Sequence, residues 1–287
     1  MILQSEILKL SEQYGVLPDT IDKDWVLGHF LAELYQTDWA QQYLVFKGGT
    51  CLKKCYFDEY RFSEDLDFTL INLDFAITNQ LIQSVCDLIT IKTGILFSNP
   101  KIEPIVWNNH QVGYITFLHF WGANHKRNQQ PPVSGRWQTS IKIEIIYYEM
   151  LVNLPEHRRL LSQYSDKLIF ELITIPCYSL LEVIAEKFRA LLQRSYPAPR
   201  DYYDLWNLLQ NDKLVDKDKI GSTFRQKAQF KHIEFHGYND FFETEQLKKV
   251  KQAWTNSLQN HLKENTLPDY EKVITDLNVI CAEIKWI

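Results

Sequence analysis

Hydrophobic and polar residues follow two different periods in the first half of the chain, which predicts both helices and strands there. Apolar residues recur at helical spacing over residues 2–14, 23–37, 50–60 and 75–93. A short apolar run at 42–46 and an alternating pattern at 61–70, 112–121 and 139–148 indicate strands. We therefore expect an α+β arrangement in this half.

The strand pattern fades from about Asp166, and helical spacing dominates afterwards. The sequence predicts a strong helix over 178–194, another over 201–210, and helices in most of the rest, apart from an irregular stretch at 232–240. We expect two domains, an α+β domain at 1–165 and a helical domain at 166–287.

Composition narrows the class of protein. The 287 residues are 45% hydrophobic and 23% charged, with a net charge of −5, as in ordinary soluble globular proteins. A negative net charge argues against a protein that coats DNA nonspecifically, although a local basic patch could still bind nucleic acid. The amino-terminal helix lacks the features of a signal peptide, and no apolar stretch approaches the length of a membrane span. We expect a cytoplasmic protein with no membrane partner.

The five cysteines are scattered, and their odd number argues against a disulfide framework. Cys51 and Cys55 share one face of a predicted helix, but no second pair completes a zinc-binding set. We interpret the cysteines as small buried hydrophobic residues.

The stretch FKGGTCLKKCYFDEYRFSEDLDFTL, residues 46–70, carries the first candidate chemistry. Asp65 and Asp67 alternate with apolar residues, so they point to the same side of a strand, with Cα atoms about 6.6 Å apart. Two carboxylates this close repel each other unless a cation lies between them, and Mg²⁺ prefers such oxygen ligands. The alternative is an exposed strand face with ordinary solvated acids.

Three further features lie near these aspartates in the predicted arrangement. Ser63 is expected on the carboxylate face, and the glycine pair before Thr50 allows backbone N–H groups to approach a phosphate. In TSIKIEIIYYEM, Glu144 shares a face with Lys142, opposite a row of isoleucines. Glu144 is either a third carboxylate of the site or half of a solvent-facing Lys/Glu pair. Lys47, before the glycines, either helps to bind phosphate or faces solvent, and we favour the second.

KGGTCLKKCY followed by RFSEDLDF resembles the motif of the AbiEii/AbiGii-type nucleotidyltransferase toxins, which belong to the polymerase-β-like superfamily. Arg61, Ser63, Asp65 and Asp67 match every fixed place of the family's R-x-S-x-D-x-D string. Gly49-Thr50 stands where the superfamily has glycine-serine. The resemblance implies a mixed sheet flanked by helices, followed by a helical domain that completes the active site.

A second region, LLEVIAEKFRALLQRSYPAPRDYYDLWNLL, resembles the family's lysine-bearing helix and its R-D-x-x-D element through Lys187, Arg200, Asp201 and Asp204. From its spacing alone, Lys187 borders an apolar helix face, so its ammonium either reaches water or meets a phosphate. Asp201 is equally explained by its place at a helix start. Asp204 lies inside the helix and is the preferred active-site acid.

The resemblance implies a nucleotidyltransferase that moves NMP from an NTP to an acceptor, which is RNA such as the tRNA 3′ end or protein. It further implies the toxin of a toxin–antitoxin or phage-defence system, with a separately encoded antitoxin as partner. Alternatives are a catalytically inactive nucleotide- or RNA-binding regulatory module, or a metal-dependent phosphoester hydrolase.

In the favoured hypothesis each candidate residue has a role. Lys187 neutralises phosphate charge, and Asp204 aligns or deprotonates the acceptor. The expected ligands of Mg²⁺ or Mn²⁺ are Asp65, Asp67 and Glu144. The expected contacts of the NTP are Gly48, Gly49, Thr50, Arg61, Ser63 and Lys187.

Overall fold

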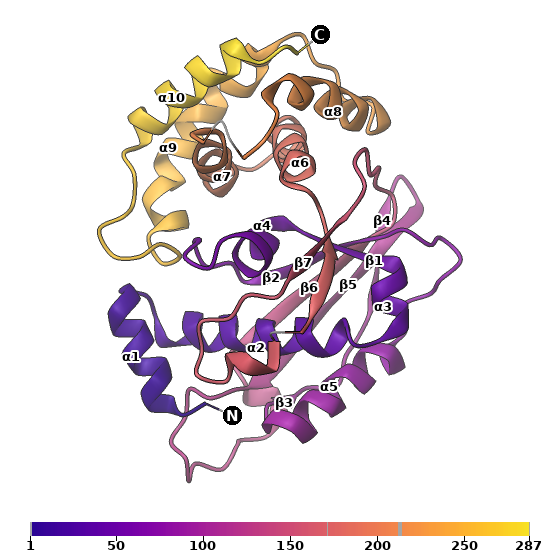
Figure 1. Cartoon of the computed structure of the whole chain (residues 1–287), viewed down its shortest axis with the longest axis vertical. Helices are drawn as coiled ribbons and strands as arrows, with labels where there is room; N and C mark the ends of the chain where they lie inside the picture. Colours follow the sequence, from indigo (N-terminus) through magenta and orange to yellow (C-terminus); the bar gives the residue numbers. More distant parts are fainter. Residues whose placement is uncertain (1, 171, 212–213, 287) are drawn as a thin grey trace. The chain divides into compact units, whose positions relative to one another are not determined.

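The chain forms two compact units in the computed structural model, which describes residues 2–170, 172–211 and 214–286 (Figure 1). The first unit comprises Met1–Glu149 and Glu156–Cys177, and the second comprises Met150–Pro155 and Tyr178–Ile287. The sequence placed one boundary between residues 165 and 166. In the structure the short strand β8 (Thr174–Cys177) pairs with β1 (Leu44–Lys47) and extends the first unit past that point.

A mixed sheet organises the first unit. Its strands run in the order β3-β5-β6-β2-β1-β8-β7, with β4 paired to β5. The β2–β6 and β1–β8 pairs are parallel and the others antiparallel. The remaining strands are β2 (Asp65–Leu70), β3 (Leu96–Phe97), β4 (Glu103–Trp107), β5 (His110–Trp121), β6 (Ser140–Ile146) and β7 (Glu156–Arg159). This mixed sheet with flanking helices confirms the expected α+β fold.

The two faces of the central strands differ in polarity. Leu66, Phe68, Ile143 and Ile145 are at most 2% exposed and belong to the core of the unit. That apolar face is covered by α2 (Pro18–Leu34) and α5 (Asn79–Thr93), and α1 (Gln4–Tyr14) packs on α2 (Figure 1). Each fully buried large apolar side chain stabilises the fold by roughly 1.5–3 kcal/mol. The face of β2 and β6 that carries these side chains therefore packs into the core, and the opposite face carries the polar residues.

The segment between the glycines and β2 differs from its prediction. Instead of one helix over 50–60, a short α4 (Gly48–Cys51) continues into a π-helical turn (Leu52–Tyr56), in which Phe57 N donates to Leu52 O at 2.9 Å. The strand begins at Asp65 and not at Arg61. Ser63 therefore precedes the strand, so strand alternation does not determine which way its side chain points.

The second unit is helical, as predicted. An aromatic cluster forms much of its core, with ring centroids 4.7–5.7 Å apart. The cluster consists of Phe188, Phe224, Phe235, Phe241 and Trp286. The helices are α6 (Leu180–Gln193), α7 (Pro199–Leu209), α8 (Lys217–Phe230), α9 (Thr244–Leu258) and α10 (Tyr270–Glu283). Within the described ranges, no helix is sufficiently long and apolar to cross a membrane.

A buried ion pair holds the segment Met150–Pro155 in the second unit. Lys227 Nζ lies 2.7 Å from Glu182 Oε1, and neither side chain is exposed. The Glu182 carboxylate accepts hydrogen bonds from the backbone N–H groups of Val152 (3.1 Å) and Asn153 (3.0 Å), while Lys227 Nζ donates to Met150 O at 2.8 Å. These bonds satisfy both buried charges, which would otherwise be costly to bury.

Candidate active site

Three carboxylates lie on the polar face of the central strands. In the parallel pairing of β2 with β6, Asp65 lies opposite Lys142 and Asp67 lies opposite Glu144. Neighbouring strands are about 4.8 Å apart, so side chains at paired positions are in direct reach of each other. The structure therefore brings Glu144 to Asp67, and Lys142 Nζ forms an ion pair with Glu144 Oε2 at 2.6 Å.

The electrostatics of this face disfavour a charged Asp67. Burial raises the pKa of Asp67 to about 7, and the negative charges of Glu144 and Asp65 add to the effect, against the opposing charges of Lys47 and Lys142. A divalent cation among these oxygens would reverse the balance by favouring the ionised carboxylates. Asp65, Asp67 and Glu144 offer the oxygen ligands that Mg²⁺ and Mn²⁺ prefer, but among the described residues their carboxylate oxygens do not all lie within 4.8 Å of one another.

Lys47 contributes to this face, contrary to the sequence-based prediction. Only 7% of Lys47 is exposed, so the expectation that it faces solvent is wrong. It ends β1 directly opposite Asp67, and its Nζ lies 3.6 Å from Glu149 Oε2. The antiparallel pairing of β1 with β2 causes this placement, and neither strand's own pattern reveals it.

The glycine turn packs directly against the acidic strand. Gly48 has φ = +83°, a conformation that other residues rarely adopt, and a Cβ there would overlap the Asp67 carboxylate. A Cβ on Gly49 would lie 2.7 Å from Arg61 Nη2 and 3.0 Å from Ser63 Oγ. The two halves of the motif thus meet in space, and the positive φ of Gly48 favours glycine at that position.

Thr50 has a structural contact that the sequence did not predict. It is 1% exposed, and its hydroxyl donates to Asp65 O at 2.5 Å, which fixes the start of β2 relative to α4. Arg61 is also buried, at 5% exposure, and its Nη1 donates to Phe62 O at 3.2 Å. Ser63 is half-buried beside Gly49.

A second charged cluster lies within the second unit. Lys187 Nζ, on α6, is 2.9 Å from Asp201 Oδ1 and 2.6 Å from Asp204 Oδ2, both on α7. Lys187 is 8% exposed and Asp204 is fully buried, so the alternative in which Lys187 extends into water is excluded. Arg194 Nη1 also contacts Asp201 Oδ2.

Arg200, from the same sequence element, has a different environment. Its Nε donates to Ser257 O at 3.2 Å, and its Nη2 lies 2.6 Å from His261 Nε2. These contacts join the start of α7 to the end of α9. Lys187, Asp201 and Asp204 are brought together, whereas Arg200 has contacts of a structural kind.

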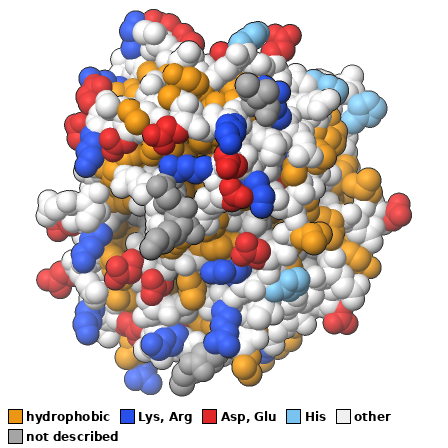
Figure 2. Space-filling model, turned by 45° about the horizontal axis from the view of Figure 1, so that its top comes forward, with side chains coloured by type: hydrophobic (Ala, Val, Ile, Leu, Met, Phe, Trp, Pro, Cys, Tyr) orange, Lys and Arg blue, Asp and Glu red, His pale blue; other side chains and the backbone are white. Residues whose placement is uncertain are grey.

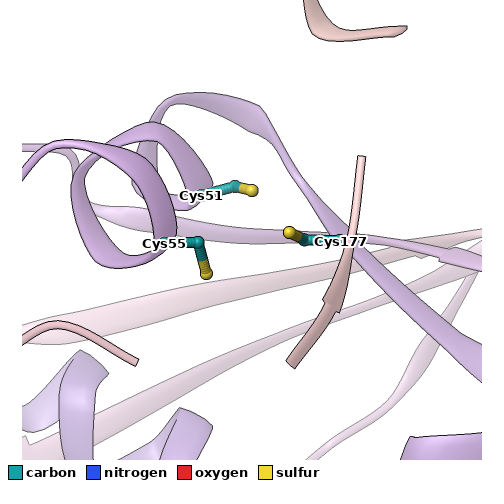
Figure 3. Close-up of side chains that lie close together, drawn as sticks. All are labelled: Cys51, Cys55 and Cys177. Atoms are coloured by element: carbon teal, nitrogen blue, oxygen red, sulfur yellow. The ribbon is translucent and has the colours of Figure 1, made fainter. Parts of the chain in front are cut away.

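Three cysteines also cluster in the first unit. The sulfur atoms of Cys51, Cys55 and Cys177 lie within 4.8 Å of one another, and Figure 3 shows the side chains from α4, the π-helical turn and β8 converging. Burial raises the pKa of Cys51 and of Cys55, so their thiols are protonated at neutral pH. Among the described residues, no fourth cysteine, histidine or acid joins the three in such a group. All five cysteines are buried, as predicted.

The exposed charges are mixed in sign on the face drawn in Figure 2, where Lys and Arg side chains alternate with Asp and Glu. This distribution agrees with the net charge of −5. This face therefore has no broad basic surface of the kind that attracts a polyanionic acceptor.

Comparisons with known proteins identify the family to which the sequence is matched and solved structures with a similar fold. The family described as "Nucleotidyl transferase AbiEii toxin, Type IV TA system" matches residues 29–276. MenT4, a nucleotidyltransferase toxin from Mycobacterium tuberculosis H37Rv, superposes with a TM-score of 0.64 at 18% identity, over 99% of this chain and 91% of that one. A protein from H. pylori, described as a nucleotidyltransferase, superposes with a TM-score of 0.55 at 15% identity, over 92% and 93% of the two chains. No curated protein matches by sequence. At these identities the structural likenesses show the fold alone.

Proposed function

Because the chain belongs to the AbiEii nucleotidyltransferase toxin family, we propose that it transfers NMP from an NTP to an acceptor hydroxyl, with a divalent cation bound by Asp65, Asp67 and Glu144. The observation that supports this most directly is the packing of the Gly48 backbone against the Asp67 carboxylate. A phosphate-binding turn and a metal-binding strand then belong to one site. Mg²⁺ or Mn²⁺ would supply charge neutralisation for the phosphates.

The chain's own residues would bind and orient the NTP. Backbone N–H groups at Gly48 and Gly49 lie beside the acids and would bind the leaving β- and γ-phosphates. Ser63 and Arg61, which lie against Gly49, would add hydrogen bonds to the same phosphates. Thr50 supports this arrangement by holding the start of β2.

The chemical step is an in-line displacement. The acceptor oxygen forms a bond to the α-phosphorus, the bond from the α-phosphorus to the bridging oxygen breaks, and pyrophosphate leaves while the acceptor proton passes to solvent. We propose that Lys187 stabilises phosphate charge in this step, held in place by Asp201 and Asp204. Asp204, which is fully buried, would act through Lys187, whose ammonium it holds. Positioning and electrostatics supply most of the rate in such reactions.

The proposed partners are an NTP, an acceptor and a separately encoded antitoxin. Acceptor RNA, with the tRNA 3′ end favoured, is the first candidate and protein is the second. The proposed setting is a toxin–antitoxin or phage-defence system in the cytoplasm. A phosphoester hydrolase would use the same acids, but the glycine turn favours binding of a triphosphate.

The test is label transfer. The protein is incubated with Mg²⁺, each labelled NTP in turn, and total cellular RNA or protein, beside Asp65→Ala and the matched control Asp74→Ala, whose carboxylate is exposed. We expect labelled acceptor with wild type and the control, and none with Asp65→Ala. Release of NMP or RNA fragments without transfer would indicate hydrolysis, and binding without chemistry would indicate an inactive module.

The role of Lys187 needs its own control, because removing a buried lysine also destabilises the fold by leaving the charge of a buried carboxylate uncompensated. Lys227→Met breaks a similarly buried lysine–carboxylate pair with no proposed role in transfer. We expect Lys187→Met to abolish transfer in protein that remains folded by circular dichroism. Under the same conditions, Lys227→Met protein that remains folded should retain transfer. Equal loss in both variants would refute a specific role for Lys187.

A further inference from the structure

The carboxylate face of the sheet continues one strand beyond Glu144, onto β5. Phe117 pairs with Lys142, which in turn pairs with Asp65, so these three residues lie in one row across the strands. The neighbours of Phe117 on β5, Thr116 and Leu118, are buried on the opposite face. Phe117 therefore points to the same side as the acids, where 55% of it is exposed.

The position of this ring is specific. Two strand spacings separate Phe117 from Asp65, or about 9.6 Å between backbones at about 4.8 Å per strand. Ile115, which pairs with Glu144 in the next row, is half-buried on the same face. Together with Phe117 it forms an apolar shelf beside the charged residues.

The geometry of the reaction identifies which substrate would reach this shelf. In an in-line displacement the attacking and leaving oxygens lie on opposite sides of the phosphorus. The glycine turn follows β1, on one side of β2, whereas β6 and β5 lie on the other side. If pyrophosphate leaves toward the glycine turn, the acceptor approaches from the side of Glu144 and Phe117.

We propose that Phe117 stacks against the base of the acceptor's terminal nucleotide and so positions its hydroxyl. The inference rests on the proposed function and adds a subsite for an unpaired nucleobase. Proteins recognise RNA ends mainly by stacking unpaired bases on aromatic side chains, and every base offers a suitable face. The ammonium of Lys142, next to Phe117 in the row, would neutralise part of the acceptor's backbone charge.

The test distinguishes an effect on binding of the acceptor from an effect on binding of the NTP. Transfer of label to total cellular small RNA is measured as a function of RNA at saturating NTP, and as a function of NTP at saturating RNA. The variants are Phe117→Ala, Phe117→Trp and a control, Ile91→Ala, which removes an 80% exposed side chain from α5 on the opposite side of the sheet. Loss of base stacking is expected to raise the half-saturating RNA concentration by about 5- to 150-fold in Phe117→Ala.

The NTP dependence should stay unchanged in Phe117→Ala, and Phe117→Trp and Ile91→Ala should match wild type in both titrations. An unchanged RNA dependence in Phe117→Ala, or a shift in the NTP dependence instead, would overturn the subsite while leaving transfer intact. Label on protein but not on RNA with wild type would also overturn it. Absence of any label with wild type would refute the proposed function itself.

Discussion

Replacing Asp67 by asparagine tests the electrostatics of the acidic face directly. The pKa of Asp67 rises from 3.8 to about 7 in the folded protein, mainly because of burial and then because of Glu144 and Asp65. Each pKa unit corresponds to about 1.36 kcal/mol, so a charged Asp67 would cost the fold at most about 4 kcal/mol. The side chain keeps some contact with solvent, which screens the charge, and we expect an effect of about 1–2 kcal/mol.

The sign of the pH dependence follows from linkage. Between the unfolded pKa near 3.8 and the folded value of about 7, the native state holds a proton that the unfolded state has lost. The stability of the wild type therefore falls as the pH rises through this window and levels off above it. Asp67→Asn does not lose stability in this way. It should therefore be only slightly more stable than wild type at pH 5, and the difference in stability should be largest at pH 8.

The measurement is urea unfolding in EDTA at several pH values, with hydrogen exchange of β2 amides to assign the transition to the first unit. Asp74→Asn, which changes an exposed carboxylate, serves as the control and should show no such pH dependence. Adding Mg²⁺ at pH 8 should stabilise wild type and have little effect on Asp67→Asn, because bound ligand stabilises the state that binds it. A difference between Asp67→Asn and wild type that is the same at pH 5 and pH 8 would refute the reasoning.

Three further predictions use other contacts. Gly48→Ala should destabilise the first unit by about 1–3 kcal/mol in urea unfolding, because of the positive φ and the clash with Asp67, whereas Gly135→Ala, with open space around it, should change little. Lys227→Met should lower the stability of the second unit by about 3–5 kcal/mol, because it leaves the Glu182 charge buried; a loss below about 1 kcal/mol would contradict this. The five cysteines are all buried, so they should react with a thiol reagent only after denaturation, and fast labelling of any one in the native protein would disagree.

Local patterns in the sequence were sufficient to predict which side chains share a face. Period-two alternation correctly grouped Asp65 with Asp67, and Lys142 with Glu144, because alternation is a property of one strand alone. Helical spacing likewise correctly located α6 and α7. These features depend on residues close in sequence.

Features that depend on strand order could not be predicted in this way. The burial of Lys47 results from its pairing opposite Asp67, and the approach of Cys177 to Cys51 results from β8 lying beside β1. Strands as short as four residues, such as β7 and β8, carry too few positions to show a period. The predicted orientation of Ser63 depended on where β2 begins. The alternating pattern starts before Asp65, so the sequence did not show that the strand begins there.

The buried pair that holds residues 150–155 has a consequence for synthesis on the ribosome. The chain leaves the first unit after Glu149, returns to it at Glu156, and leaves again after Cys177. All strands of the first unit are therefore translated before Glu182 and Lys227, the two side chains that bind the segment. We expect residues 150–155 to remain a solvated loop on the nascent chain until α8 has emerged. A polypeptide released before that point would lack the partners that order this loop.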